Sequence, residues 1–199
     1  MQRKISFSLA AFICAVVLIM GAGIASAQIT DVFSVNYFRQ NVSIAPAAFV
    51  SITNPGLTYG TLCAEIYVFD QDQQLSECCG CIETHNGLRT LSVRNNLTDN
   101  PLTSVRSDAG VIKIVSASLP PNNVCDPTIV IPRPNLRAWA THVQLPIGYP
   151  SIGNFFPITE TEFSPSTLGA AELAGLQAQC SFIHILGSGH GICTCGTGD

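Results

Sequence analysis

Apolar and polar residues alternate along this chain in short runs that end at turn residues, with fairly regular spacing between runs. The clearest runs are "AAFVSITNPG", "TLCAEIYVFD", "LRTLSV", "VIKIVSAS", "LRAWATHVQL" and "FPITETEF". Period-two alternation bounded by Asn, Pro and Gly is typical of β-strands. The second run is apolar on both faces, which predicts a central strand, and "TIVIP" predicts at most a short edge piece because prolines limit it. In "LRAWATHVQL", Ala138, Ala140 and His142 share one face, and Trp139 lies on the other.

Near the C-terminus the apolar residues recur at helical spacing, which predicts one helix over about residues 168–184. A capping segment, "SPST", precedes "LGAAELAGLQAQCSFIH", and the apolar stripe at spacings of 3, 4 and 3 comprises Leu173, Leu176, Cys180 and Ile183. Cys180 therefore faces the core, where a disulfide could tie the helix to a sheet. The predicted fold is mainly β: an immunoglobulin-like or Greek-key β-sandwich with one C-terminal helix, stapled by disulfides.

The N-terminus has the pattern of a secretory signal peptide. Arg3 and Lys4 precede an apolar run over residues 5–24, and "ASA" before Gln28 is a small-x-small cleavage site. We expect a signal peptide over residues 1–27 and a single secreted β-rich domain over 28–199, with a Gly- and Cys-rich tail from 186. The alternative is an uncleaved anchor, since the run is long enough to span a bilayer.

The expected mature chain is acidic and low in charge. It keeps seven basic and thirteen acidic side chains, about −6 in net charge. That balance opposes binding to nucleic acid or to an anionic membrane, because both require a basic face. No second run of spanning length follows the signal. The partner remains open at this point, with self-association or a protein or glycan ligand as the possibilities.

Cysteine usage indicates an oxidising, extracellular or periplasmic compartment. Cys14 leaves with the signal, and an even number in an exported chain predicts up to four disulfides. The eight that remain are Cys63, Cys78, Cys79, Cys81, Cys125, Cys180, Cys193 and Cys195. Close neighbours such as Cys78 and Cys79 cannot pair without strain, so each should join a distant partner.

The cluster "CCGCIETH" offers other chemistry, and its spacing argues against most of it. Covalent haem attachment needs His directly after the second cysteine of Cys-x-x-Cys, and Ile82 stands there. A redox dithiol of Cys78 and Cys81 needs a helix N-terminus to stabilise its thiolate, and here a turn and a strand follow. Structural bridges are the better interpretation.

A metal site is the alternative to a purely structural role. Thiolate and imidazole ligands suit zinc or copper, and "CCGC" with His85 could join the C-terminal set in space. An exported chain consumes its thiols as disulfides, so we predict no metal and no cofactor. The candidates, if thiols remain free, are Cys180, His184, His190, Cys193 and Cys195.

No set of residues in the sequence predicts catalysis. "GSGHG" contains Ser188 and His190, but it lacks the first glycine of a nucleophile elbow and follows a helix. Glu160 and Glu162 share a strand face and would suit calcium or a glycosidase pair, although a solvent-exposed face explains them equally well. "DQDQQ" is expected to form a polar turn. We predict a structural, surface or binding module rather than an enzyme.

Three segments carry a resemblance: "LCAEIYVFDQDQQLSECCGC", "GLRTLSV" with "NNLTDNPLTS", and "LAGLQAQCSFIHILGSGHGICTCG". Together they resemble a family of exported, cysteine-rich bacterial proteins of the kind found in acidobacteria. The resemblance implies a secreted bacterial domain and carries over no catalytic residue.

Overall fold

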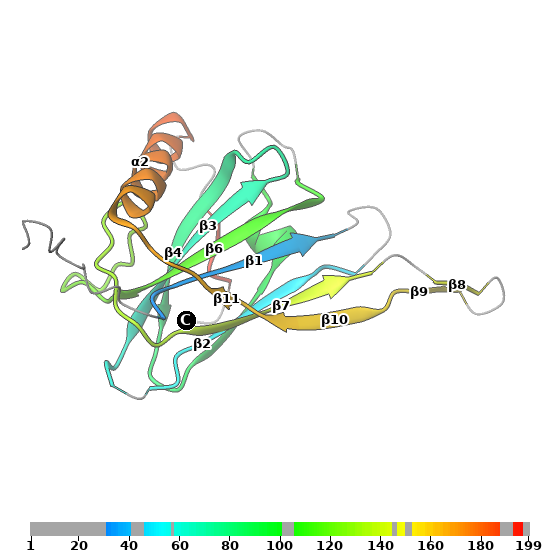
Figure 1. Cartoon of the computed structure of the whole chain (residues 1–199), viewed down its shortest axis with the longest axis horizontal. Helices are drawn as coiled ribbons and strands as arrows, with labels where there is room; N and C mark the ends of the chain where they lie inside the picture. The colour runs from blue at the N-terminus through cyan, green and yellow to red at the C-terminus, as the bar shows by residue number, and fades with distance from the viewer. Residues whose placement is uncertain are drawn as a thin grey trace, which may run out of the picture.

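A computed structural model describes residues 31–40, 46–56, 58–100, 106–144, 147–149, 153–187 and 193–196. The expected signal peptide, residues 1–27, lies outside them. Two antiparallel sheets face each other, and a single long helix lies against the outside of one sheet (Figure 1). Among the described residues, no helix is long and apolar enough to cross a membrane.

Nine strands make up the two sheets. Sheet A has, in spatial order, β11 (Ser164–Pro165), β1 (Phe33–Arg39), β6 (Ala109–Ser118), β3 (Leu62–Asp70) and β4 (Leu75–Glu83). Sheet B has β10 (Ile158–Glu162), β7 (Arg137–Val143), β2 (Phe49–Thr53) and β5 (Leu88–Ser92). Two short strands, β8 (Ile147–Tyr149) and β9 (Gly153–Phe155), pair with each other, η1 (Val93–Leu97) is one π-helical turn, and α2 is Ala170–Gly187.

The predicted fold class is confirmed: the chain is mainly β, in two packed sheets with one C-terminal helix and four disulfides. β6 returns to pair with β3, as in a Greek-key return connection. The predicted central strand is β3, which pairs on both sides and has seven consecutive buried residues from Leu62 to Val68.

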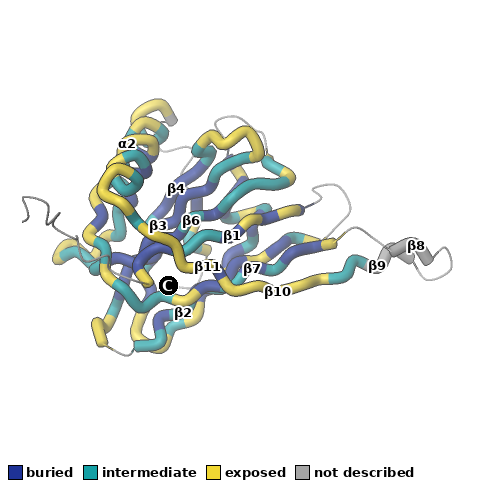
Figure 2. The backbone as a smooth tube through the Cα atoms, viewed as in Figure 1, coloured by how far each residue is buried: buried dark blue, intermediate teal, exposed yellow. Residues whose placement is uncertain are grey.

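The core between the sheets follows the alternation in the sequence. Inward-facing residues of sheet A meet those of sheet B, and almost all of them are branched aliphatic or small. They include Val50, Ile52, Ala64, Ile66, Val68, Leu91, Ile112, Ile114, Ala138 and Ala140. Along β2 and β7 in Figure 2 the colour of buried residues alternates with the colours of intermediate and exposed ones.

Sheet A is also covered on its outer face, by α2 and by the loop between β6 and β7. A second cluster there joins Phe33, Tyr67 and Val115 of the sheet to Val130 of the loop and Leu176 of α2. The Tyr67 hydroxyl donates a hydrogen bond to the Pro127 carbonyl, 2.7 Å away. Sheet A is therefore buried on both faces, whereas sheet B packs on its inner face alone within the described residues.

Four disulfides close this architecture, and all eight predicted cysteines take part. They are Cys63–Cys125, Cys78–Cys180, Cys79–Cys193 and Cys81–Cys195. Side chains alternate along β4, so Cys78 points outward to α2, while Cys79 and Cys81 point into the core toward the C-terminal tail. Each cysteine of the cluster thus joins a distant partner, as its spacing predicts.

The glycine of "CCGC" has a packing role. A Cβ built on Gly80 would lie 2.6 Å from the carbonyl oxygen of Cys125 and even closer to the Glu65 carboxylate. Only glycine lets the loop that carries Cys125 approach β4 this closely. The motif is therefore a structural junction where one strand meets a loop, a helix and the tail.

Three details differ from the sequence-based expectation. The strand-like runs named in the sequence do not include the cysteine cluster, yet it lies within β4, because strand pairing and disulfide formation involve the same residues. The helix runs from Ala170 to Gly187 rather than over 168–184, since its start follows the sheet-bound segment β11. "TIVIP" forms only an isolated bridge from Pro132 to Ala117, because prolines prevent a continuous ladder.

Candidate binding face

The outer face of sheet B is a whole sheet face on which no other element of the described residues packs. We name it the open face, and strand register defines it: Ser51 of β2, Trp139 of β7 and Glu162 of β10 lie side by side in one row. In the next row Glu160 lies opposite Thr141. The whole face comprises Phe49, Ser51, Thr53, Leu88, Thr90, Arg137, Trp139, Thr141, Glu160 and Glu162.

The open face combines aromatic rings with hydroxyl and carboxylate side chains. Its centre is Trp139, the one tryptophan of the chain, in a surround of hydroxyls and carboxylates. Ser51 and Thr90 place their hydroxyl oxygens 3.4 Å apart, and the Phe49 ring is 42% exposed. A tryptophan offers a flat apolar surface with a polar handle, and the oxygens around it accept or donate hydrogen bonds.

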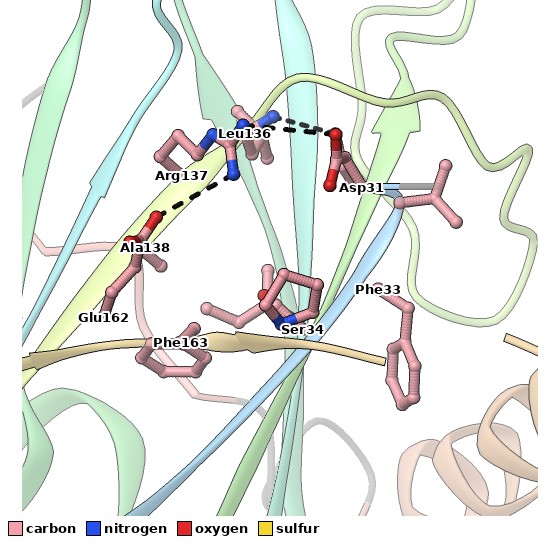
Figure 3. A pocket seen from close by; sticks show the side chains of 12 residues that line it. Asp31, Phe33, Ser34, Leu136, Arg137, Ala138, Glu162 and Phe163 are labelled. Atoms are coloured by element: carbon pink, nitrogen blue, oxygen red, sulfur yellow. Dashed lines mark hydrogen bonds and ion pairs between the residues drawn. The ribbon is translucent and has the colours of Figure 1, made fainter. Parts of the chain in front are cut away.

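A shallow hollow lies at one end of the open face, where β1, β7 and the β10–β11 segment meet. Figure 3 shows Arg137 reaching between two carboxylates, Asp31 at 4.0 Å and Glu162 at 3.8 Å. The cavity behind them measures about 20 Å³, roughly the volume needed by one water molecule. It is too small for a substrate, so an extended ligand would have to lie on the face itself.

A polar cluster lies at the same edge of the sandwich, with His142 and Asn36 buried and Tyr37 and Thr161 exposed. The His142 Nε2 atom lies 2.6 Å from the Thr161 hydroxyl, and the Asn36 amide donates to that hydroxyl over 3.1 Å. The Tyr37 ring stacks on the imidazole with 4.2 Å between centroids. Burial lowers the pKa of His142, because desolvation disfavours the imidazolium. With a side chain only 1% exposed, this histidine is a structural group.

Two buried carboxyls lie on opposite faces of sheet A. Desolvation and, second, repulsion by the nearby Asp126 carboxylate raise the pKa of Glu65 to about 8. Desolvation and then Asp99 raise the pKa of Glu77 to about 8 as well. Both are protonated near neutral pH. Because the sheet separates them and no nucleophile of the described residues adjoins either, they do not form an acid–base pair.

The cysteines and histidines that the sequence offers as possible metal ligands do not lie together. Cys180 bonds to Cys78, and the Nε2 atom of His184 lies 3.6 Å and 3.7 Å from those two sulfurs. Cys193 and Cys195 lie on the other side of β4, inside the sandwich. As disulfide sulfurs they carry no thiolate, which is the metal ligand. Ser188 and His190 lie outside the described residues.

The glutamate pair of β10 and the polar turn after β3 have the arrangement that the sequence predicts. Glu160 and Glu162 do share one exposed face of β10. The segment "DQDQQ" forms the β3–β4 turn, in which the Asp70 carboxylate accepts hydrogen bonds from the backbone of Asp72 and Gln74. His85 is exposed, and its Nδ1 atom lies 2.9 Å from the Asn86 amide nitrogen rather than at the cysteines.

Sequence reasoning did not single out Trp139 as the centre of a site. The available signal was the alternation in "LRAWATHVQL", which turns Trp139 away from the buried face. What the alternation could not give is that nothing in the described chain covers that side. Comparisons of this chain with protein-family models, curated proteins and solved structures found no match.

Proposed function

We propose that this chain is an exported, disulfide-stapled binding module whose open face binds a neutral, hydroxyl-rich ligand, a glycan. The proposal rests on one observation: the outer face of one sheet is covered by other elements and the outer face of the other sheet is not. A helix and a long loop cover the outer face of sheet A, whereas the outer face of sheet B leaves Trp139 among hydroxyls and carboxylates.

The residues of the open face suit a glycan in three ways. The Trp139 ring can stack against the C–H face of a pyranose ring, which is apolar. Glu160 and the hydroxyls of Ser51 and Thr141 can pair with sugar hydroxyls, since carboxylates accept and hydroxyls both accept and donate. The charged residues of the open face are Arg137, Glu160 and Glu162, so the face is net negative and disfavours an anionic ligand.

Export is the second part of the proposal. Four disulfides within one domain indicate an oxidising compartment. The signal-peptide pattern of residues 1–27 supports secretion with Gln28 as the first mature residue. The bacterial family that the sequence resembles is consistent with this compartment.

Titration of the single tryptophan is the direct test. Neutral oligosaccharides added to the mature protein should shift and saturate the fluorescence of Trp139, and an anionic oligosaccharide should bind more weakly. Calorimetry should show binding lost in Trp139→Ala and kept in Val124→Ala, which removes an exposed apolar side chain from the β6–β7 loop, outside the open face. A flat response to a broad neutral glycan panel would overturn the proposal.

A second candidate function is a thiol-redox or metal protein, because the sulfurs of Cys79, Cys81 and Cys195 lie within 4.8 Å of one another. It requires that these bridges be open in the exported protein. The intact mass of the denatured, unreduced protein, with and without an alkylating reagent, distinguishes the two functions. A start at Gln28 with no alkylation favours the binding module. Several alkylated thiols with stoichiometric zinc or copper would favour the second candidate.

A further inference from the structure

Helix α2 carries very few charged residues, although it lies on the surface. Its 18 residues include one acidic side chain, Glu172, and that side chain pairs with Lys113 of β6 over 2.6 Å. The side that faces sheet A buries Leu176 and Cys180. A surface helix normally presents charged residues on its opposite side, and α2 does not.

The side of α2 turned away from the sheet carries a continuous apolar stripe. Its members recur at spacings of 3, 4, 4 and 3, which places them in one line along the helix. We name this the outer stripe: Ala171, Ala174, Ala178, Phe182 and Ile185. Phe182 is 62% exposed and Ile185 is 76% exposed, and Figure 2 shows α2 with exposed residues along its outer side.

A hollow adjoins the outer stripe. It lies between α2 and the β3–β4 turn, and its volume is about 460 Å³. The walls are Gln73, Gln74, Leu75, Ala178, Gln179, Phe182 and Ile183. The same surface therefore presents a protruding aromatic ring and a recess of the size usual for ligand pockets.

We propose that the outer stripe is a self-association surface, on which α2 of one molecule packs against α2 of a second copy of this chain. In a two-fold pair each contact occurs twice, so the surface must complement itself. Phe182 of each copy would enter the hollow of the other. The three alanines would let the helix backbones approach closely, because they add little bulk between them.

Charge favours a second copy as the occupant. Two copies of an acidic chain repel each other wherever their carboxylates meet, and the outer stripe contains no charged residue. A lipid surface fits less well, because interfacial helices carry Lys and Arg beside their apolar face and α2 has neither. This inference is independent of the proposed glycan site, which lies on the other sheet.

The available area is close to what a specific dimer needs. Large apolar side chains contribute roughly 150–200 Å² each when fully buried. If the exposed parts of the outer stripe and of the neighbouring Leu186 are all covered, each copy buries roughly 500 Å², or about 1,000 Å² in total, the lower limit for a specific interface. Interfaces of this size are typical of transient complexes, so we expect a reversible dimer.

Analytical ultracentrifugation of the mature, oxidised protein over a wide concentration range tests the proposal. The wild-type protein should shift from monomer to dimer. Ile185→Glu and Phe182→Glu should each weaken the dimer more than tenfold, because they bring like charges together at the two-fold axis. Since both side chains point to solvent, their melting temperatures should match that of the wild type.

Ile129→Glu is the matched control, because this isoleucine is 70% exposed on the loop after β6. It should leave the dissociation constant unchanged. A wild-type protein that stays monomeric at high concentration would overturn the proposal, as would an undiminished dimer in the α2 variants. Binding of the monomer to zwitterionic vesicles, lost in Ile185→Glu, would assign the stripe to lipid and overturn it too. Because the open face is untouched, glycan binding should be unchanged in every variant.

Discussion

The two open edges of the sandwich are closed by different means. At the first, which we name the tail seam, β4 and β5 face each other and the C-terminal residues 193–196 close the gap. At the second, which we name the crossing seam, β1 faces β7 and the chain itself passes from sheet B to sheet A between β10 and β11.

The tail seam is held by covalent bonds and by a buried cation. Cys193 and Cys195 bond to β4, and the Thr194 amide donates to the Asn96 carbonyl over 2.9 Å. Arg89 of β5 lies at the centre. Its Nε donates to Glu83 of β4 over 2.7 Å, and its other nitrogens donate to the carbonyls of Cys195 and Ile82.

The crossing seam is held by packing and by hydrogen bonds. Phe163 turns into the core at the point where the chain changes sheets, and its amide donates to the Ala138 carbonyl. Three residues later the Ser166 amide donates to Phe33 of β1. At the crossing seam the backbone itself connects the two sheets, whereas at the tail seam the disulfides of Cys193 and Cys195 make the covalent connection to β4. We therefore predict that the stability of the tail seam depends on redox conditions, whereas the stability of the crossing seam depends on its hydrogen bonds.

Removing both tail bridges should have the largest effect. Replacing all four cysteines of Cys79–Cys193 and Cys81–Cys195 by serine should lower the free energy of unfolding by about 2–5 kcal/mol per bridge. That approaches the whole stability of a domain of this size. Denaturant titration measures the loss. Thr161→Val, which breaks the crossing-seam hydrogen bonds, should cost about 1 kcal/mol. Equal losses in the two variants would contradict the comparison.

Two arginines, one at each seam, provide a matched pair. Arg89→Ala removes a buried ion pair with Glu83 and two hydrogen bonds to backbone carbonyls, so it should cost about 3–5 kcal/mol. Arg137→Ala removes ion pairs of 3.8–4.0 Å from a half-exposed side chain and should cost less than about 1 kcal/mol. Chemical denaturation of both variants checks this order. A loss in Arg137→Ala as large as that in Arg89→Ala would be inconsistent with a cation-dependent tail seam.

Glu77 on β4 should make the protein less stable as pH rises. Its pKa is about 8 in the folded state and 4.5 in the reference state, so folding retains a proton between these values. The contribution of this proton to stability is complete below pH 4.5 and is lost as pH rises from 4.5 to 8. Over this range the free energy of unfolding falls by at most about 1.4 kcal/mol per pH unit. Unfolding free energies at several pH values should show a flatter slope in Glu77→Gln. Glu65 gives a similar contribution, so Glu65→Gln is the second variant, and an unchanged slope in both would refute the assignment.

His142 at the crossing seam should act in the opposite direction, and its effect should be the smallest. Its pKa is lowered in the folded state. Its contribution to stability is therefore complete above its ordinary value of 6.5 and is lost as pH falls through and below that value. His142→Asn should remove this acid sensitivity, as followed by thermal melting between pH 4 and pH 7. A steeper acid response in the variant would show that another group is responsible.

The fold could be predicted because local pattern and tertiary environment agree over most of the chain. Alternation gave the faces of β7, and the continuous apolar run identified β3 as a strand buried on both sides. The cysteine count and spacing gave distant pairing but not the partners. The disulfide connectivity depends on which side of β4 each sulfur faces. Because side chains alternate along a strand, Cys78 faces α2 and Cys79 faces the tail, but this could be predicted only if the segment were known to be a strand.

The candidate site could be predicted only in part. Glu160 and Glu162 share a face, as the alternation requires, but their importance depends on Trp139 in the neighbouring strand. Register between strands is set by tertiary pairing and is not encoded in the spacing of either strand alone. The helix shows the same limit. Its buried stripe was predictable from Leu173, Leu176 and Cys180, whereas the exposure of Phe182 depends on what surrounds α2.

Three of the four bridges join β4 to residues between 180 and 195, and this fixes the order of events in biosynthesis. A polypeptide emerges from its N-terminus, so β4 appears about a hundred residues before its covalent partners. Until then its three cysteines are free and adjacent, open to one another and to any oxidase in the compartment. Native closure must wait until Cys193 and Cys195 have been synthesised and can reach β4. A chain truncated before Cys193 would contain all of its strands but would lack the two bridges that join β4 to the tail.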